Sequence, residues 1–456
     1  MISDMQSIDI DWAWQPFQAS SEQPWTRGLA AHLYRRAGFG ADMASLDKAV
    51  KQSPGEIVAE MLARSTTDSS FRGSADALTQ TVLASGDPQR LSSAWVYRLL
   101  FTPTQLVEKA VLFWHGHFAS SADKVKDANL LWQQNQLLRQ HALGDFGQLA
   151  LAIAQDPAML IYLDSSVNRK AHPNENFARE LMELFCLGEG NYSEQDVREL
   201  ARCFTGWEVK NKLFRKNRYQ QDTGVKSLLG ASGNFDGEDG VRVVLQQTHL
   251  EQFLSRKWYR FFIADQPAPT AELLQPLADT FRRHDLQIAP AVQMILQSNL
   301  FYSSIALGQR IKSPVELIVG TLRSLKATTN TQLIAQGLRR IGQGLFYPPN
   351  VKGWDGGRAW INSSTLLGRS NLLAELLFHE STQFDGQSLG GYLESAGART
   401  VEQVIEHFET CLLARPLDAH TRAQLAASVT THTGDKERRL RALLLACTSL
   451  PLCQLS

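Results

Sequence analysis

Apolar residues recur at intervals of three and four along most of this chain, which is the spacing of an amphipathic helix. The segment from Val197 to Phe204 is one example. Ser193 is a suitable N-cap just before it, and Gly206 a suitable stop just after it. The pattern therefore predicts a helix that starts after Ser193 and ends before Gly206.

The same signals predict further helices and very little strand. Thr102 with Pro103 at the first helical position opens one helix, and Thr248 opens another. Gly434–Leu445 reads as a basic amphipathic helix with a solvated face. Only residues 207–228 have the alternation of a β-hairpin. We therefore expect a mainly α protein, one large multi-helix domain that can comprise two lobes, with at most that small hairpin.

The chain of 456 residues contains no internal repeat and no long biased linker. Residues 1–25 are polar with scattered Trp and show no clear period. We expect them to form an N-terminal arm that lies on a helical domain of residues 26–456.

Charge and composition exclude several classes of protein. Lys plus Arg and Asp plus Glu both number 46, and this balance argues against nucleic acid as the main partner. No run approaches the roughly 20 apolar residues of a membrane span. The acidic N-terminus lacks the basic and apolar regions of a signal peptide, so we expect a cytoplasmic protein. The 5 cysteines form no C-x-x-C pair and are expected to be free buried thiols.

The first candidate for chemistry is the segment Phe113–Phe118, where His115 and His117 flank a glycine. Two imidazoles so close together can ligate a metal or exchange protons near neutral pH. The alternative is that both rings hydrogen-bond to backbone near the end of a helix. The sequence leaves the presence of a metal open and points to no cofactor.

A second candidate is the helix predicted between Asn174 and Gly188. At 100° per residue, Asn176, Glu180 and Glu183 fall on one flank of its apolar stripe. A carboxylate beside an apolar face can have a raised pKa and act as a general acid or base. Arg179 can pair with an acid four residues away. The alternative is an acidic flank that pairs with a neighbouring helix through Arg198 or Arg202.

A third candidate is the loop between Leu345 and Asn362, which is rich in Pro, Gly and Trp. Prolines and packed aromatic rings would fix this loop, and glycines allow unusual backbone angles. Asn350, Lys352 and Trp354 are its candidate binding residues, with Trp as a stacking surface. The alternative is a structural loop that fills a gap in the core.

These segments, in this order, resemble a bacterial family called domain of unknown function 1800. The resemblance rests on AHLYRRAGFG from Ala31, FWHGHFASS from Phe113, DPAMLIYLD from Asp156, NENFARELMELFCLGEGNYSEQDV from Asn174, FTGWEV from Phe204, KSPVELIVG from Lys312, and PPNVKGWDGG from Pro348 with the Trp-Ile-Asn that follows. It covers nearly the whole chain. It supports the idea that the polar segments converge on one site, and it implies no particular reaction.

Two features differ from the relatives that this resemblance implies. Many relatives have a histidine where this chain has Gln221, before Asp-Thr-Gly. If that histidine is essential in them, activity here is in doubt. Relatives are also often exported, whereas the first residues of this sequence do not read as a signal peptide. They are often encoded beside proteins of the alkaline phosphatase and sulfatase superfamily, which implies a partner of that kind.

Two functional hypotheses follow from the sequence. In the first, the protein is a hydrolase or transferase with a polar His/Glu/Arg pocket for a polar or anionic substrate. In the second, it is a non-catalytic scaffold or partner subunit for a phosphatase- or sulfatase-like protein. An enzyme should bring His117, Glu180 and the Asn350–Trp354 loop together at a concave surface. A scaffold should bury these groups as satisfied pairs.

Overall fold

A computed structural model of the chain describes residues 8–63, 69–431 and 434–456. Across these residues the protein is 60% helical, with 23 helices and three two-stranded sheets. The prediction of a mainly α single domain, more than half helix, is confirmed.

The helices divide into two halves along the sequence. Those of the first half are α1 (Ile10–Trp14), α2 (Arg27–Ala37), α3 (Met43–Ala49), α4 (Pro54–Ala63), α5 (Ser69–Ala84), α6 (Pro88–Phe101), α7 (Gln105–His117), α8 (Ala128–Gln140), α9 (Phe146–Ala154), α10 (Pro157–Tyr162), α11 (Asn176–Glu180) and α12 (Glu194–Cys203). Those of the second half are α13 (Gly237–Leu245), α14 (Leu250–Phe262), α15 (Ala271–Arg283), α16 (Ile288–Gln297), α17 (Pro314–Ser324), α18 (Thr331–Arg340), α19 (Ser363–Leu377), α20 (Leu389–Ser395), α21 (Val401–Leu412), α22 (Ala419–Thr431) and α23 (Lys436–Ser449).

The predicted helix starts have mixed outcomes. Ser193 caps α12 in a complete capping box with Asp196, as its sequence predicts. In α7 the N-cap is Thr104 rather than Thr102, and its side chain makes no capping hydrogen bond. The Thr102 hydroxyl instead hydrogen-bonds to the Thr104 hydroxyl and accepts a second hydrogen bond from the Thr104 backbone N–H. The capping box proposed at Thr102 is therefore wrong, because these hydroxyls pair with one another.

Strand is confined to short antiparallel pairs. β1 (Trp207–Lys210) pairs with β2 (Leu213–Lys216) inside the region predicted as a hairpin. A second hairpin follows from β3 (Lys226–Leu228) and β4 (Ala231–Gly233). The third pair, β5 (Ala327–Thr328) and β6 (Gln383–Phe384), joins the segments that follow α17 and α19. None of these sheets is large enough to organise the fold.

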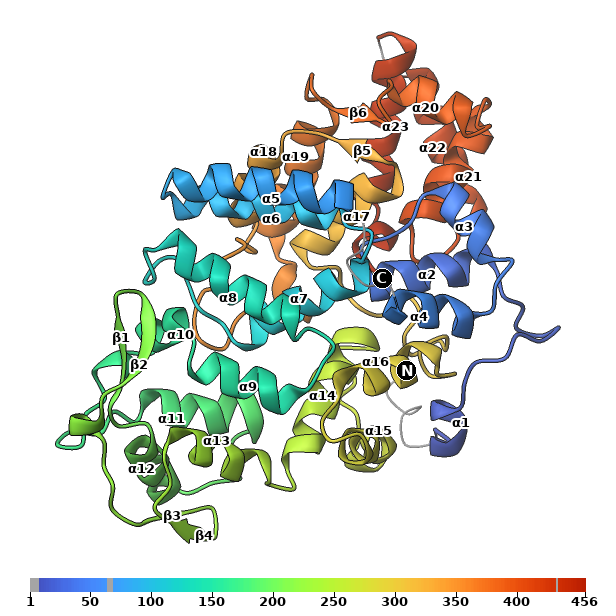
Figure 1. Cartoon of the computed structure of the whole chain (residues 1–456). Coiled ribbons are helices and arrows are strands. Elements are labelled where there is room, and N and C mark those ends of the chain that lie inside the picture. The colour runs from blue at the N-terminus through green and yellow to red at the C-terminus, as the bar shows by residue number, and fades with distance from the viewer. Residues whose placement is uncertain (1–7, 64–68, 432–433) are drawn as a thin grey trace.

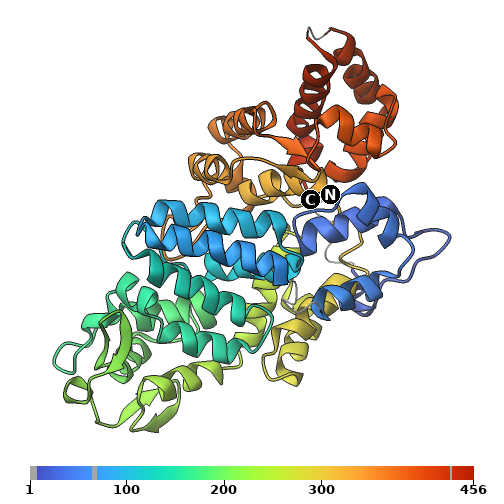
Figure 2. The same cartoon turned by 45° about the horizontal axis from the view of Figure 1, so that its top comes forward.

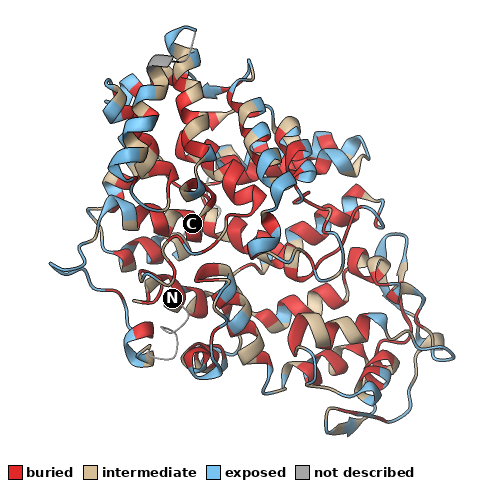
Figure 3. Cartoon of the chain, turned by 180° about the vertical axis from the view of Figure 1, so that it is seen from behind, coloured by how far each residue is buried: buried red, intermediate tan, exposed pale blue. Residues whose placement is uncertain are grey.

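The helices are arranged with the first two hairpins at one end of the molecule and α20–α23 at the other (Figures 1 and 2). Helices α5 to α8 and α17 lie between these ends. Buried residues line the inward faces of helices along the whole length (Figure 3). They form one continuous apolar core, from Ala13 to Cys453. At its N-terminal edge, Trp14 of α1 donates a 2.7 Å hydrogen bond to the Leu273 carbonyl.

Two further expectations concern membrane segments and cysteines. Among the described residues, none of the helices combines the length and the apolar character that crossing a bilayer requires. The cysteines at positions 186, 203, 411, 447 and 453 are all free and buried. The prediction of buried free thiols is confirmed.

Candidate functional site

The end of α7 and the loop after α18 meet at a pair of glycines. Gly353 has a φ of +76°, and a Cβ on it would overlap the carbonyl of Gly116. Glycine is required at position 353 both by this contact and by the left-handed backbone. On the other side, Gly116 faces the indole of Trp354. The H-G-H segment and the Pro-Gly-Trp loop, which the sequence indicated separately, are therefore in direct contact.

A cavity of about 170 Å³ opens beside this contact. Its walls come from α7, α14, α17 and the two segments 310–313 and 343–360. The residues that line it are Leu112, Phe113, Gly116, His117, Lys257, Arg260, Phe261, Asp265, Arg310, Ser313, Glu316, Gln343, Lys352, Trp354, Asp355, Gly356 and Trp360. We call it the α14 cavity.

Cationic side chains dominate the chemistry of the α14 cavity. Within the part of the chain that the structure describes, Lys257, Arg260 and Lys352 have no hydrogen bond or ion pair through their side chains. Burial, and then repulsion from Arg260, lower the pKa of Lys257 to about 8. Lys257 is half-buried, and an unpaired, partly desolvated cation is costly unless an anion neutralises it. Arg260 and Lys352 are exposed and add positive charge to the cavity without this desolvation cost. The cavity is therefore suited to an anionic ligand.

Several polar atoms around the same cavity are also buried without a protein partner. They are His117 Nδ1, Asp265 Oδ2, Arg310 Nε and Trp354 Nε1. Arg310 Nε and Asp265 Oδ2 lie 3.9 Å apart, which is within ion-pair distance but too long for a hydrogen bond. Because buried polar groups are normally hydrogen-bonded, atoms of this kind gathered at one cavity indicate a site for a polar ligand.

His117 lines the cavity in a defined tautomer. Its Nε2 lies 3.0 Å from the Phe185 carbonyl, which can only accept, so Nε2 carries the proton and Nδ1 is an acceptor. Burial and the nearby Lys257 hold the pKa of His117 well below its ordinary value. The ring is therefore a neutral hydrogen-bond acceptor at physiological pH.

His115 has a structural role instead. It is buried, and its Nε2 accepts a 3.1 Å hydrogen bond from the Phe346 backbone N–H. Burial lowers the pKa of His115 to about 3. The two histidines thus bind different backbone segments, Phe346 and Phe185, as the alternative interpretation of this segment predicted. Among the described residues there is no group of three or more His, Cys, Asp or Glu that could hold a metal.

The helix predicted between Asn174 and Gly188, which we call the acidic helix, is not a regular α-helix along its whole length. After α11 the backbone widens into a π-helical segment, Leu181–Cys186, in which the Leu187 N–H bonds to the Met182 carbonyl. The Phe185 carbonyl lies near the end of this segment, where carbonyls lack helical partners, and it accepts from His117. Single π-turns are frequent at functional sites. This one connects the acidic helix to the α14 cavity.

Most of the predicted residues on this helix have protein partners. Arg179 pairs with Glu194 at 2.7 Å and Glu175 at 3.3 Å. Asn176 donates to the Leu163 carbonyl at 3.0 Å, and Glu183 accepts from the Tyr192 hydroxyl at 2.9 Å. These three residues do not line the α14 cavity, and their contacts are structural.

Glu180 lies at the edge of the site. Burial raises its pKa, and repulsion from Glu183 adds to this, while the Lys352 ammonium opposes it. Glu180 therefore lies near Lys352, although it does not line the cavity itself. The structure brings His117, Lys352 and Trp354 to one cavity and leaves Glu180 beside it.

In the predicted loop, two of the three candidate residues face the site. Lys352 and Trp354 line the cavity. Asn350 is exposed and turns the loop, because its side chain accepts from the Lys352 N–H at 2.9 Å and its carbonyl from the Gly353 N–H at 3.1 Å. Gln221 lies before β3, among residues that do not line the cavity.

Six charged residues of the cavity were not predicted as site residues: Lys257, Arg260, Asp265, Arg310, Glu316 and Asp355. A signal for two of them exists in the sequence, since Lys257 and Arg260 interrupt the aromatic stripe of α14 with no acid nearby. Asp265 and Arg310 have no such local signal. They lie after α14 and before α17, far apart in sequence, and only the fold brings them within 3.9 Å of each other.

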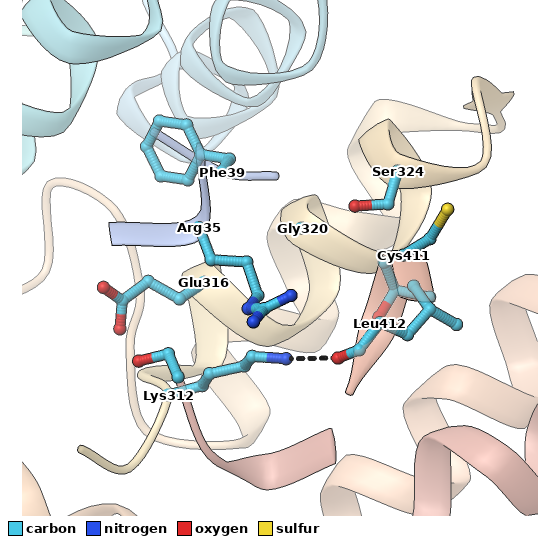
Figure 4. A pocket seen from close by; sticks show the side chains of 10 residues that line it. Arg35, Phe39, Lys312, Glu316, Gly320, Ser324, Cys411 and Leu412 are labelled. Atoms are coloured by element: carbon cyan, nitrogen blue, oxygen red, sulfur yellow. Dashed lines mark hydrogen bonds between the residues drawn. The ribbon is translucent and has the colours of Figure 1, made fainter. Parts of the chain in front are cut away.

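A buried network of charged side chains adjoins the cavity and shares Glu316 and Arg310 with its lining. Glu316 of α17 binds Lys109 at 2.5 Å and Arg310 at 2.6 Å. Although burial alone would raise the pKa of Glu316, these two cations hold it well below its ordinary value. Figure 4 shows Arg35 and Lys312 beside α17, with the Lys312 ammonium bonded to the Leu412 carbonyl at 3.0 Å. Cations thus outnumber acids around this part of the core.

Comparison with known proteins identifies one family. The description "Protein of unknown function (DUF1800)" matches residues 32–454, nearly the whole chain. No curated protein and no solved structure matches the chain.

Proposed function

The chain belongs to the family described as Protein of unknown function (DUF1800), and we propose that its α14 cavity binds an anionic substrate for hydrolysis or group transfer. The observation that carries this proposal is the set of cavity cations without carboxylate partners in the described chain: Lys257, Arg260 and Lys352. Such cations are stabilised by a bound anion, and they can hold negative charge that develops during a reaction.

The groups around the cavity suit hydrolysis of an anionic ester. The Asp265 carboxylate, rather than Glu180, lines the cavity and has a buried oxygen without a hydrogen bond, so it can take a proton from an attacking water. Lys257, with a pKa near 8, can give a proton to the leaving group. His117 Nδ1 and Trp354 Nε1 supply one acceptor and one donor that orient the substrate.

Titration calorimetry with inorganic phosphate and with sulfate at pH 7 tests the binding step. We expect each anion to bind, and Lys257→Ala and Arg260→Ala each to weaken binding about tenfold, the value of one charge-assisted hydrogen bond. Lys51→Ala is the matched control, because Lys51 is exposed and remote from this cavity. If the parent protein binds neither anion, the scaffold hypothesis, with a phosphatase- or sulfatase-like partner, replaces this proposal.

The pH dependence of binding adds a second readout. Lys257 is cationic below a pKa of about 8 and neutral above it, so anion affinity should fall as the pH rises from 7 to 9. In Lys257→Arg the guanidinium stays charged, and this fall should disappear. Turnover of chromogenic phosphate and sulfate esters, lost in Asp265→Asn while anion binding persists, would separate an enzyme from a binding protein.

A further inference from the structure

A second cavity, of about 520 Å³, adjoins the α14 cavity. The two share Lys257 and Arg260, so these side chains stand at the boundary between them. The residues that line the second cavity are Leu187, Gly188, Glu189, Asn191, His249, Gln252, Phe253, Arg256, Lys257 and Arg260. It begins where the π-helical segment ends, and we call it the outer cavity.

The boundary and the outer cavity carry three cations from one turn of α14: Arg256, Lys257 and Arg260. Arg256 and Arg260 are four residues apart, about 6 Å along the helix axis. In the described chain, none of the three has a carboxylate within ion-pair distance. Lys257 lies over the Phe253 ring, 5.2 Å from its centre. Glu189 is the one acid among the residues that line the outer cavity.

Like charges at this spacing on a helix repel one another, which lowers the stability of the free protein. The repulsion is visible in the lowered pKa of Lys257, to which Arg260 contributes. A single small anion in the α14 cavity can neutralise Lys257 and Arg260, but it leaves Arg256 unmatched. An anion that continues into the outer cavity neutralises all three.

We infer that the ligand of this site carries linked phosphoryl groups, one in the α14 cavity and the next across the Lys257–Arg260 boundary in the outer cavity. The inference rests on the proposed anion binding and specifies its substrate class. A phosphoryl group carries up to about two negative charges at neutral pH, so linked groups match three cations within one helical turn better than two carboxylates do. Arginine forks such as Arg256 and Arg260 also fit phosphoryl oxygens in pairs.

Calorimetry with inorganic phosphate and with tripolyphosphate tests this inference. Tripolyphosphate should bind the parent protein at least tenfold more tightly than phosphate does. Arg256→Ala should remove most of that advantage and leave the affinity for phosphate within about twofold, because Arg256 lines only the outer cavity. Lys51→Ala should change neither affinity.

The outcomes separate this inference from the proposed function. If neither ligand binds, the proposed anion site itself is wrong. If phosphate binds and tripolyphosphate binds no more tightly, or if Arg256→Ala weakens both ligands equally, the site takes a single anion and the inference is overturned. A third titration with adenosine triphosphate distinguishes the source of the phosphoryl chain. Tighter binding than tripolyphosphate indicates a nucleotide, and weaker binding an unsubstituted chain.

Discussion

Glu180 is half-buried and Glu316 is buried, but only Glu316 forms ion pairs in the described chain. Glu316 accepts from Lys109, Arg310 and the Ser313 backbone N–H. Glu180 has no ion pair or hydrogen bond in the described chain, and burial and Glu183 raise its pKa. Burial and Glu183 therefore outweigh the attraction of Lys352 and Arg179 for the charge of Glu180, whereas the charge of Glu316 holds two buried cations.

The two isosteric changes Glu180→Gln and Glu316→Gln should consequently differ in stability. Glu316→Gln leaves Lys109 and Arg310 without their charge partner and should lower the free energy of unfolding by about 3–5 kcal/mol. Glu180→Gln removes a repelled charge and should leave that free energy unchanged or raise it by up to about 1 kcal/mol. Urea unfolding at pH 7 measures both. A loss of several kcal/mol in Glu180→Gln would show that this glutamate is a structural partner.

At the scale of elements, the site depends on the contact between α7 and the loop that carries Lys352 and Trp354. Two glycines of the segment after α18, Gly342 and Gly353, have positive φ, +97° and +76°. A Cβ at Gly342, which does not line the cavity, meets nothing within 4 Å, whereas one at Gly353 would overlap the Gly116 backbone. The pair therefore separates backbone strain from the steric contact.

We predict that Gly353→Ala displaces the loop and weakens phosphate binding at least tenfold, while Gly342→Ala leaves that affinity nearly unchanged. Both changes place a side chain at a positive φ, at a cost of about 1 kcal/mol each. Only the first forces α7 and the loop apart. Calorimetry together with thermal unfolding of the two variants measures these effects. Equal loss of affinity in both would mean that strain, and not the contact, disturbs the site.

At the scale of the whole molecule, buried polar contacts link helices that are far apart in sequence. Arg36 of α2 donates to the Phe262 carbonyl at 3.0 Å and to the Ser456 hydroxyl at 2.9 Å. Lys312, just before α17, donates to the Leu412 carbonyl at the end of α21 at 3.0 Å. Together with the continuous apolar core, these contacts should make helices α20–α23 unfold together with the rest of the chain.

Tryptophan fluorescence and far-ultraviolet circular dichroism test this coupling, because the 10 tryptophans all lie between positions 12 and 360. Fluorescence therefore reports on the body that contains the site, whereas dichroism also reports on α20–α23. We predict coincident urea transitions. A dichroism phase without a fluorescence change would show that the C-terminal helices unfold independently.

The sequence by itself determined the fold class, the places of most helices and three of the residues that line the site, His117, Lys352 and Trp354. Caps and helical periods act over a few residues, so Ser193 could be recognised without any partner from elsewhere. The density of His, Gly and Trp likewise marked His117, Lys352 and Trp354 as site residues, and the structure brings them to one cavity. The hairpin after Trp207 was predicted for the same local reason.

Only the tertiary structure decided which polar groups have protein partners. His115 and His117 have similar sequence surroundings but different partners. The Phe346 backbone N–H, 231 residues away, donates to His115, whereas His117 donates to the Phe185 carbonyl of the π-helical segment. The sequence marks the cations of α14 only as interruptions of its aromatic stripe, because a lysine or arginine is unpaired only if the packed neighbours bring no acid to it. Solvent exclusion and charge pairing depend on these long-range contacts, and so does the chemistry of the site.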